Sequence, residues 1–441
     1  MESRLIKLLL ICLVVSACSN EKQINPTSPK AEHSQYVNRL WHSTISEALS
    51  EPLWLEDFAY DAANALMLPM YYSFKFPERF TIETQQEFNT FFREVSLNFH
   101  PQQIENRVVK TQFIYFTTQY LKLRNQYGFW DDKDTKLFIL LTDELHLLWN
   151  DEVAIHWDQS LNFVGIKERV LWKLQAKEVA FSYYNAFIDE EWFTISAISD
   201  LINVGNNQGL PHSFDNDEIY NISTAVLSNF LAYEDQYLYF QKGTWFDHRD
   251  YRYAGHENVA ENLAPSYVKN IAVDSSHSHR LPLFIDSFSS ISSDKEYYKK
   301  IISELMRTFS DQALTSMEID DQFVILQNNY FDGHNGLYRY SYSTLNEGSG
   351  YGPYQLSGTL FVGYYAFFES DGYRDSMKKM QSSFPINDQA LALYVGPKST
   401  RARHYLFDWP AYFNNGFAEL FTYLSACYNS DLNSCEIKEQ K

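Results

Sequence analysis

Two long stretches of the chain concentrate side chains that can exchange protons, bind anions or pack against sugar rings. The first spans residues 242–276 and continues to 280, with Trp245, Asp247, His248, Arg249, Asp250, Arg252, Tyr253, His256, Glu257, Asp274, His277, His279 and Arg280. The second spans residues 316–352, ends in a glycine-rich run, and is followed by Tyr354 and Gln355. Connections this long inside a compact domain are uncommon, and ordered ones usually carry function. We therefore expect both stretches to line one cleft.

Carboxylates in these stretches could support hydrolysis of a glycosidic bond. One carboxyl group must protonate the leaving oxygen, and a second must act as base or nucleophile, about 5–5.5 Å away for retention or about 6.5–9.5 Å for inversion. Asp247, Asp250, Glu257 and Glu347 are the candidates. Glu347 is the most attractive because it lies on a glycine-rich loop beside aromatic residues, but a solvated loop charge would have the same pattern.

Other residues of the same stretches suit elimination at a uronic acid. That reaction needs a base such as Tyr or His, together with an Arg or Asn that neutralises the sugar carboxylate. Tyr253, His256 and His277 offer a base, and Arg280 offers the positive charge. Hydrolysis and elimination both remain open from the sequence.

The polar cluster before residue 281 has simpler interpretations as well. Asp274 precedes an apolar run and could cap a helix. His277 and His279 could bind a metal with His248 or His256, but residues two apart on a helix point to different sides. We therefore predict no metal and no cofactor at this cluster.

The glycine-rich run at residues 348–352 permits close backbone approach and positive φ angles. Tyr351, Tyr354 and Gln355 beside it offer ring packing and hydrogen bonds to a sugar. The spacing matches neither a phosphate-binding loop before Lys-Ser or Lys-Thr nor a dinucleotide fingerprint. We therefore expect substrate contacts here rather than nucleotide binding.

Further substrate contacts are expected from a basic segment and from one earlier loop. Residues 398–404 place Arg401 and Arg403 beside Lys398 and His404, with Trp409 close behind. Together with the arginines at 249, 252 and 280, they could bind an anionic glycan. Pairing with the protein's own surplus acids is an equally good explanation. His212, in the loop before residue 215, is another candidate.

The composition limits the partners of this protein. The formal net charge is −20, which argues against nucleic acid as a ligand. Aromatic residues make up 17% of the chain. Most of them must pack in the core, and some could line a cleft that binds sugars. A polysaccharide, either neutral or anionic, is therefore the expected ligand.

The N-terminus has the layout of a bacterial secretory signal. Arg4 and Lys7 precede an apolar run at 8–15 that is too short to span a bilayer. Residues 15–18 (VSAC) resemble a lipobox, which implies cleavage after residue 17 and acylation of Cys18. Such an anchor holds a protein on a membrane, and residues 18–35 read as a flexible tether. Ser19 favours the periplasmic face of the outer membrane, with the inner membrane or cell surface as alternatives.

Two cysteines near the C-terminus would remain free to pair after processing. Cys427 and Cys435 enclose a short loop, and an oxidising periplasm favours a disulfide between them. Neither belongs to a C-x-x-C pair, so zinc is the weaker interpretation. Residues 431–441 read as a polar tail.

Helical periodicity dominates the elements that must position these side chains. Stretches with this period lie near 36–49, 55–74, 83–98, 109–128, 133–150, 166–187, 190–203, 219–240, 278–290, 294–314, 353–370, 386–395 and 410–427. An Asp215 cap is expected before the helix near 219. The best strand candidate is 336–343. The sequence therefore predicts one all-α domain over residues 36–430.

Roughly a dozen helices joined by short turns indicate stacked helical hairpins, either an open solenoid or a closed ring. No fixed repeat length is visible, which favours the ring. In helix content, aromatic richness and loop segments, the chain resembles the (α/α) toroids, or six-hairpin folds, of glycan-cleaving enzymes. The resemblance implies a polysaccharide hydrolase or lyase. The alternative is a non-catalytic lipoprotein that binds, exports or assembles a polysaccharide.

Overall fold

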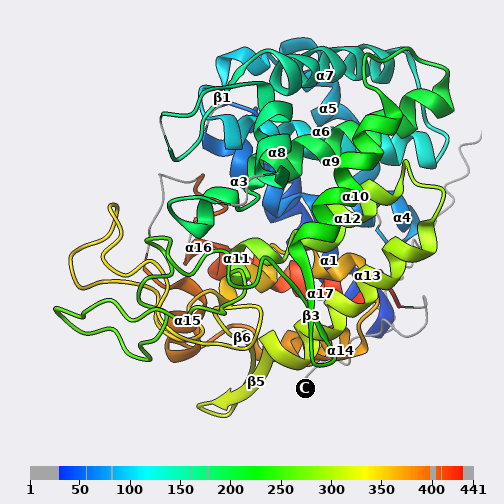
Figure 1. Ribbon diagram of the computed structural model, residues 1–441. Coiled ribbons are helices and arrows are strands. Elements are labelled where there is room, and N and C mark those ends of the chain that lie inside the picture. Colours follow the sequence, from blue (N-terminus) through cyan, green and yellow to red (C-terminus); the bar gives the residue numbers. More distant parts are fainter. Residues whose placement is uncertain are drawn as a thin grey trace, which may run out of the picture.

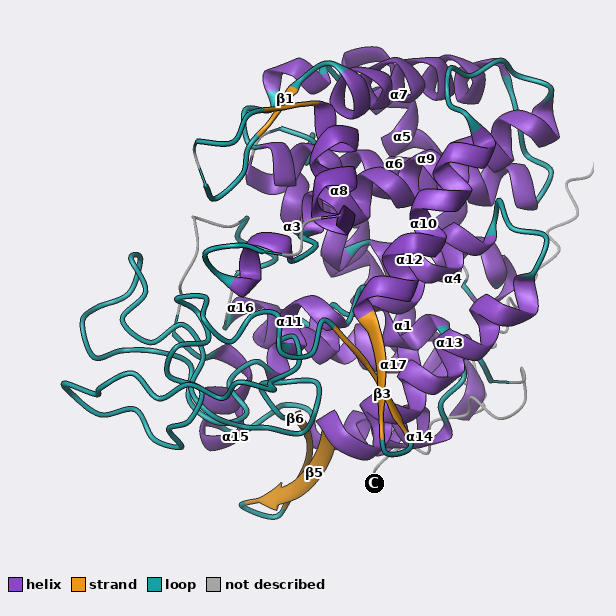
Figure 2. Cartoon of the chain, in the orientation of Figure 1, coloured by secondary structure: helices purple, strands orange, loops and turns teal. Residues whose placement is uncertain are grey.

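The computed structural model describes residues 29–55, 57–80, 83–158, 160–175, 178–397, 404–408 and 410–430. Over these ranges the chain is mostly helical, which confirms the all-α prediction (Figures 1 and 2). Regular sheet structure in the described ranges is limited to three antiparallel two-stranded hairpins. Among the helices of the described part, none combines the length and apolar character that a membrane crossing requires.

The helices and strands follow one another with short 3-10 and π segments between some of them. The helices up to residue 230 are α1 (Pro29–Trp41), α2 (Glu47–Leu49), α3 (Asp57–Ala65), α4 (Met67–Lys75), α5 (Thr84–Asn98), α6 (Arg107–Gln126), α7 (Asp132–Asn150), α8 (Gly165–Gln175), α9 (Asp189–Gln208) and α10 (Asn216–Phe230). The later helices are α11 (Ser275–Ser278), α12 (Leu281–Ser289), α13 (Lys295–Thr308), α14 (Asp371–Met380), α15 (Asp388–Val395), α16 (Ala411–Asn414) and α17 (Phe417–Tyr428). The hairpins pair β1 (Val153–Ala154) with β2 (Phe163–Val164), β3 (Leu231–Glu234) with β4 (Tyr237–Phe240), and β5 (Leu314–Ile319) with β6 (Gln322–Gln327).

Side-chain caps fix several helix starts. Asn106 accepts hydrogen bonds from the first backbone amides of α6, and Asp131 forms a capping box with Asp134 at the start of α7. Asp215 caps α10, as predicted. At the C-terminal end of α9, Gly209 has a φ of 66°, a left-handed conformation that glycine adopts without strain. These local signals explain why most helix boundaries lie close to their predicted positions.

The core is built around α6 and α9, which pack against each other. Helices α3, α7 and α12 pack against this pair, and Figure 2 shows them surrounding it. Because α6 is buried on almost every side, even its polar residues lie inside, and their side chains bond internally. For example, Thr117 Oγ1 donates to Phe113 O at 2.9 Å. A central helix of this kind can carry polar side chains to the ends of the bundle.

Residues 241–274 and 328–356 form a layer without helices or strands, which we call the loop layer (Figure 2, teal). Leu337 N donates to His256 O at 2.9 Å, and Arg339 N donates to Asp250 O at 2.9 Å. The two segments approach so closely that a Cβ on Gly336 would lie 1.6 Å from the Ala254 carbonyl oxygen. A small core of its own fills the layer, made of Tyr251, Ala254, Ile271, Tyr330, Tyr338 and Leu356. Most of the first long stretch and residues 328–352 of the second therefore pack as one unit, whereas the beginning of the second stretch belongs to the hairpin of β5 and β6.

One predicted helix, 219–240, is partly wrong. Helix α10 ends at Phe230, and residues 231–240 form the hairpin of β3 and β4 with Leu231 opposite Phe240. Asp235 has a φ of 56° in the turn, a conformation that a helix does not permit. The aromatic and branched residues after 230 fit both a helical and a strand period, and cross-strand packing decided between them.

Other predicted elements also differ from the structure. The stretch 353–370 contains the 3-10 segments Ser357–Phe361 and Tyr364–Phe367 rather than an α-helix, and the helix predicted at 166–187 ends at Gln175. The strand predicted at 336–343 is a loop, because Arg339 and Ser341 both have positive φ angles. The hairpin of β5 and β6 was not predicted.

The predicted N-terminal boundary also needs correction. Helix α1 begins at Pro29, so the last part of the predicted tether at 18–35 is helical. The predicted signal peptide, the predicted acylation site Cys18 and the predicted tail at 431–441 lie outside the described residues. Cys427 is buried and disulfide-bonded, and its predicted partner Cys435 also lies outside the described residues.

Candidate active site

A cavity of about 590 Å³ lies between the helical core and the loop layer. The first turns of α6, α9 and α12 contribute Val108, Asp189 and Leu281 to its lining, and α3 contributes Tyr60 and Asn64. Its volume falls within the range of small-molecule sites. Because the N-terminal ends of three helices meet here, their partial positive charges favour an anionic ligand.

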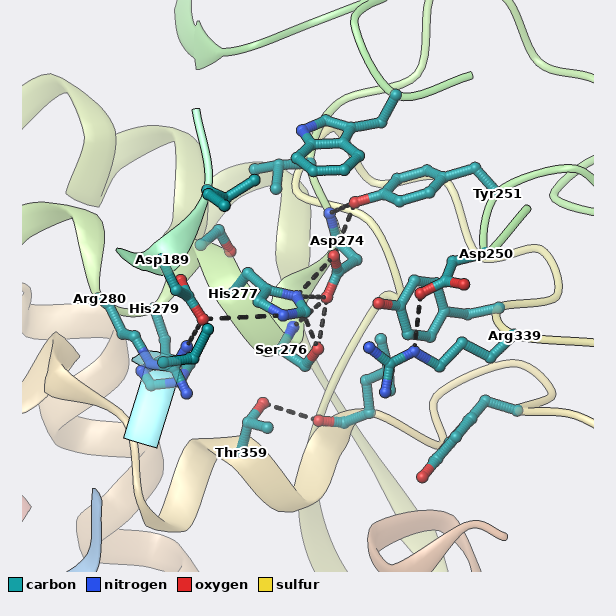
Figure 3. A pocket seen from close by; sticks show the side chains of 18 of the residues that line it. Asp189, Asp250, Tyr251, Asp274, Ser276, His277, His279, Arg280, Arg339 and Thr359 are labelled. Carbon is teal, nitrogen blue, oxygen red and sulfur yellow. Dashed lines mark hydrogen bonds and ion pairs between the residues drawn. The ribbon is translucent and has the colours of Figure 1, made fainter. Parts of the chain in front are cut away.

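His277 lies at the centre of this cavity, between Asp274 and Asp189 (Figure 3). Asp274 caps the short α11 by accepting a hydrogen bond from Ser276 N. It also accepts from His277 Nδ1 at 2.8 Å and from Tyr251 Oη at 2.6 Å. This arrangement directs His277 Nε2 away from Asp274, 3.9 Å from Asp189 Oδ2. Asp274 therefore both caps α11 and orients the ring of His277.

The charges around His277 favour its protonated form. Burial alone would lower the pKa of His277, but the negative charges of Asp274 and Asp189 outweigh burial and raise it to about 9. The positive charge and the hydrogen bond of His277, together with hydrogen bonds from Ser276 and Tyr251, hold the pKa of Asp274 far below its usual value despite burial. At neutral pH this pair is an imidazolium and a carboxylate.

Beside His277, a buried arginine links a tyrosine to a carboxylate. Arg280 is only 2% exposed. Its Nη1 donates to Asp189, and its Nη2 donates to Tyr60 Oη at 2.8 Å. Burial alone would raise the pKa of the Tyr60 phenol, but the charge of Arg280, aided by His277 and by the hydrogen bond, lowers the pKa below its ordinary value. Tyr60 therefore loses its proton more readily than its burial alone would allow.

Asn64 lies one helical turn after Tyr60 and completes this end of the cavity. Its Oδ1 accepts from Gln112 Nε2 at 2.8 Å and lies 3.5 Å from Arg280 Nη2. With the oxygen engaged on the protein side, the amide nitrogen of Asn64 is left to donate to a ligand. An amide donor, an imidazolium and a tyrosine with a lowered pKa thus share one surface.

A buried charge network holds the first turn of α9, where Asp189 lies. Arg169 Nη2 contacts Glu190 Oε2 at 2.7 Å, and Arg169 Nε contacts Glu191 Oε1 at 2.7 Å. Lys173 Nζ contacts Glu191 Oε1 at 2.8 Å. Burial lowers the pKa of Lys173 to about 8 against the opposing charge of Glu191. We call Arg169, Lys173, Glu190 and Glu191 the charge frame, because they fix the turn that presents Asp189 to Arg280.

Aromatic side chains form one wall of the cavity. The Trp157 ring lies 5.7 Å from the Trp245 ring and 5.8 Å from the ring of His248. Trp245 stacks on Tyr251, which donates to Asp274. Trp157, Trp245 and His248 all line the cavity. Such a wall suits the apolar faces of sugar rings.

Six of the residues predicted for the site line this cavity, namely Trp245, Arg249, His277, Arg280, Tyr351 and Gln355. Seven described candidates lie outside its lining, namely His212, Asp247, Arg252, Tyr253, His256, Glu347 and Tyr354. Arg401, Arg403 and Trp409 lie outside the described residues. The structure therefore brings His277, Arg280 and some of the aromatic candidates together. Of the four carboxylates considered for hydrolysis, Asp250 lines the cavity, whereas Asp247, Glu257 and Glu347 do not.

The candidates outside the cavity have other contacts. Asp247 accepts hydrogen bonds from Ser182 N and Oγ, both at 2.7 Å, and so holds a neighbouring turn. His256 bonds to a backbone carbonyl, and Tyr253 packs on a tyrosine ring 4.6 Å away. Glu347 is exposed on the loop layer. His212 follows the far end of α9, about 30 Å of helix away from Asp189.

Sequence reasoning missed Tyr60, Asn64 and Asp189 because it searched the loops rather than the helices. A signal was present: Tyr60 and Asn64 are four residues apart and share one face of a helix rich in alanine. For the metal, no group of three or more His, Cys, Asp or Glu side chains that could hold an ion occurs among the described residues.

The raised pKa of His277 predicts a pH-dependent stability. The folded protein holds this proton more tightly than the unfolded chain, whose ordinary pKa is 6.5. The stabilisation is therefore complete below about pH 6.5 and is lost as pH rises through about 9. Because 35% of the side chain is exposed, solvent screening reduces the effect, and we expect a loss of roughly 1–2 kcal/mol over this range. Urea denaturation of His277→Gln should show a flatter pH dependence than wild type, and parallel curves would contradict the assignment.

Compared with protein-family models, with curated proteins and with solved structures, this chain finds no match.

Proposed function

We propose that this protein cleaves an acidic polysaccharide by β-elimination at a uronic acid. The observation that carries the proposal is the contact between Arg280 and Tyr60, which lies beside a protonated His277. The charge of Arg280, aided by the hydrogen bond, lowers the pKa of Tyr60 despite its burial. Elimination needs a base next to a group that neutralises the sugar carboxylate, and this surface supplies both. The meeting of three helix N-termini at the cavity gives further support.

Hydrolysis fits the cavity less well. A hydrolase needs one carboxyl group kept protonated so that it can act as an acid. Four aspartates of the described residues line the cavity, and three of them are instead partners of cations: Asp189 of Arg280, Asp250 of Arg339, and Asp274 of His277. Each of these contacts commits a carboxylate to a cation of the protein. This favours elimination over the hydrolytic alternative.

The residues have distinct roles in the proposed step. Protonated His277 and the Asn64 amide hold the sugar carboxylate and stabilise the negative charge that develops on it. The Tyr60 phenolate removes the proton from the carbon next to that carboxylate. The electron pair of this C–H bond forms a carbon–carbon double bond as the glycosidic C–O bond breaks, and the Tyr60 phenol returns the proton to the leaving oxygen. Asp274 and Arg280 are positioning residues, since they act through His277 and Tyr60.

The proposal predicts an unsaturated product. Full-length protein should be incubated with polymannuronate, polyguluronate, polygalacturonate and hyaluronan, and ultraviolet absorbance of the new double bond should be followed together with reducing ends. We expect absorbance and reducing ends to rise together on at least one of these glycans. Reducing ends without absorbance would indicate hydrolysis. Binding without either product would indicate a non-catalytic polysaccharide-binding protein.

The remaining expectations from the sequence belong to the same proposal. We propose that the helical hairpins close into a ring, as in the (α/α) toroids; the convergence of α3, α6, α9 and α12 on one cavity supports this. We also propose a lipid anchor on Cys18 that holds the protein on the periplasmic face of the outer membrane. A protein placed there could degrade acidic oligosaccharides that enter the periplasm.

A further inference from the structure

We propose a second anion-binding subsite at the loop-layer end of the cavity, formed by Arg249, Arg339 and Tyr342, which holds an acidic group on a neighbouring sugar of the substrate. This inference rests on the proposed function, but the subsite consists of residues that have no role in the proposed reaction. All three side chains line the cavity. A protein with this subsite would prefer a polyanionic substrate over a glycan that contains one isolated uronic acid.

The geometry of the subsite centres on the ring of Tyr342. The Arg249 guanidinium lies 4.6 Å from the ring centroid, and its Nη2 lies 3.1 Å from Tyr342 Oη. The Arg339 guanidinium lies 4.9 Å from the same centroid. Arg339 Nε also contacts Asp250 Oδ2 at 2.9 Å. Both guanidinium groups thus contact the same tyrosine ring and lie within 4 Å of the same carboxylate.

The charges at this end leave an excess of positive charge. Asp250 can neutralise only one guanidinium, and it is committed to Arg339 through the shorter contact; Arg249 Nε is 3.7 Å from Asp250 Oδ1. Burial lowers the pKa of His248, so this neighbour is neutral at neutral pH. The Arg249 side chain is 59% exposed, and most of its five N–H donors remain open to a ligand.

The backbone that presents these residues is strained. Arg339 and Ser341 have φ angles of 52° and 49°, which non-glycine residues rarely adopt. Such strain persists where the surrounding structure holds it and is concentrated at functional sites. Here Tyr338 pairs with Tyr351 across an isolated bridge, and a Cβ on Gly350 would lie 2.8 Å from Tyr340 Cα. The loop layer therefore fixes this turn in a conformation that faces the cavity.

The two ends of the cavity are close enough to share one sugar chain. Tyr251 donates to Asp274 at one end, and its ring lies 5.6 Å from the ring of Tyr338. The Arg339 guanidinium lies 5.2 Å from that second ring. Two tyrosines thus separate the reacting surface from the subsite, a spacing that suits neighbouring sugars. The acidic group would be a carboxylate or a sulfate ester, since a guanidinium binds both in a bidentate manner.

The test measures binding in a variant that should not turn substrate over. We would compare Tyr60→Phe with Tyr60→Phe/Arg249→Gln by calorimetry, using a short polyuronate oligomer at several salt concentrations. Arg374→Gln in the same background is the matched control, because it removes the same charge from α14, away from the cavity. We expect Arg249→Gln to weaken binding by about tenfold or more and to reduce its salt dependence. Arg249→Lys should recover only part of the affinity, because it restores charge but not the planar fork.

The outcomes separate the subsite from the reaction. Equal affinity and salt dependence in the Arg249→Gln and control variants would overturn the subsite, whether or not the wild type makes an unsaturated product. Weaker binding by Arg249→Gln with no product from any glycan would keep the subsite and overturn elimination. Polygalacturonate and chondroitin sulfate, compared as ligands, would distinguish the two anions. A loss confined to the sulfated glycan would assign a sulfate, and a loss confined to polyuronates would assign a carboxylate.

Discussion

Replacing Tyr60 with phenylalanine is expected to lower kcat by about 10²–10⁴-fold, the usual contribution of a positioned acid or base. The substitution keeps the ring in α3 and removes only the hydroxyl group that Arg280 Nη2 contacts at 2.8 Å. Because the proposed base and the proposed acid are this same oxygen, both proton transfers would be lost. Initial rates of double-bond formation on the best glycan from the panel provide the measurement.

A matched variant separates lost chemistry from lost structure. Tyr298→Phe removes a hydroxyl group from another buried tyrosine, on α13, outside the lining of the cavity. It should keep wild-type turnover, and each variant should lose no more than about 1–3 kcal/mol of stability. Full turnover by Tyr60→Phe would show that another group is the base. Equal loss of turnover in both variants would show that the effect is structural.

The largest stability effect is expected in the charge frame. Glu191 is fully buried and serves both Arg169 and Lys173. Glu191→Ala would remove the carboxylate partner of Lys173 and leave Arg169 paired with Glu190 alone, which should cost about 3–5 kcal/mol in the free energy of unfolding. The first turn of α9 would loosen as well, so Asp189 would hold Arg280 less firmly and turnover should fall. Urea denaturation and initial rates measure the two effects.

The control for Glu191 is an exposed ion pair. Glu296 contacts Lys299 at 2.7 Å on the surface of α13, and its side chain is 83% exposed. Glu296→Ala should change the free energy of unfolding by at most about 1 kcal/mol. A Glu191→Leu/Lys173→Met double variant should recover part of the stability lost in Glu191→Ala, because one cation is removed with its partner. Equal effects of Glu191→Ala and Glu296→Ala would mean that the frame is not needed for stability.

The helices were largely predictable because their signals are local. Helix α6 begins after a capping asparagine, and α7 begins with a capping box, so both lie close to the predicted stretches. The failures lie where local signals conflict. Residues 231–240 carry aromatic side chains that suit a helix or a strand, and pairing between β3 and β4 settled the question. This pairing depends on contacts between two segments, so the pattern of either segment alone does not predict it.

The site was predictable only in part, for a related reason. His277 and Arg280 were found because polar residues before an apolar run stand out in the sequence. Tyr60 and Asp189 were missed, because their importance comes from a shared contact with Arg280 across segments distant in the chain. Glu347 was predicted from its position in a glycine-rich loop, but this loop leaves the residue exposed on the surface. Long-range packing decides which charged groups come into contact, and the order of residues in the sequence does not show this packing directly.

The separation between the helical core and the loop layer has a consequence for how such a protein can evolve. The groups proposed to break the bond belong to α3, α9 and the segment around α11, whereas the second anion subsite belongs to loops with a small core of their own. Substitutions in those loops could change which glycan is accepted while leaving the reacting groups in register. Evolution could thus change the glycan specificity of this protein's descendants while the residues proposed to carry out the reaction stay the same.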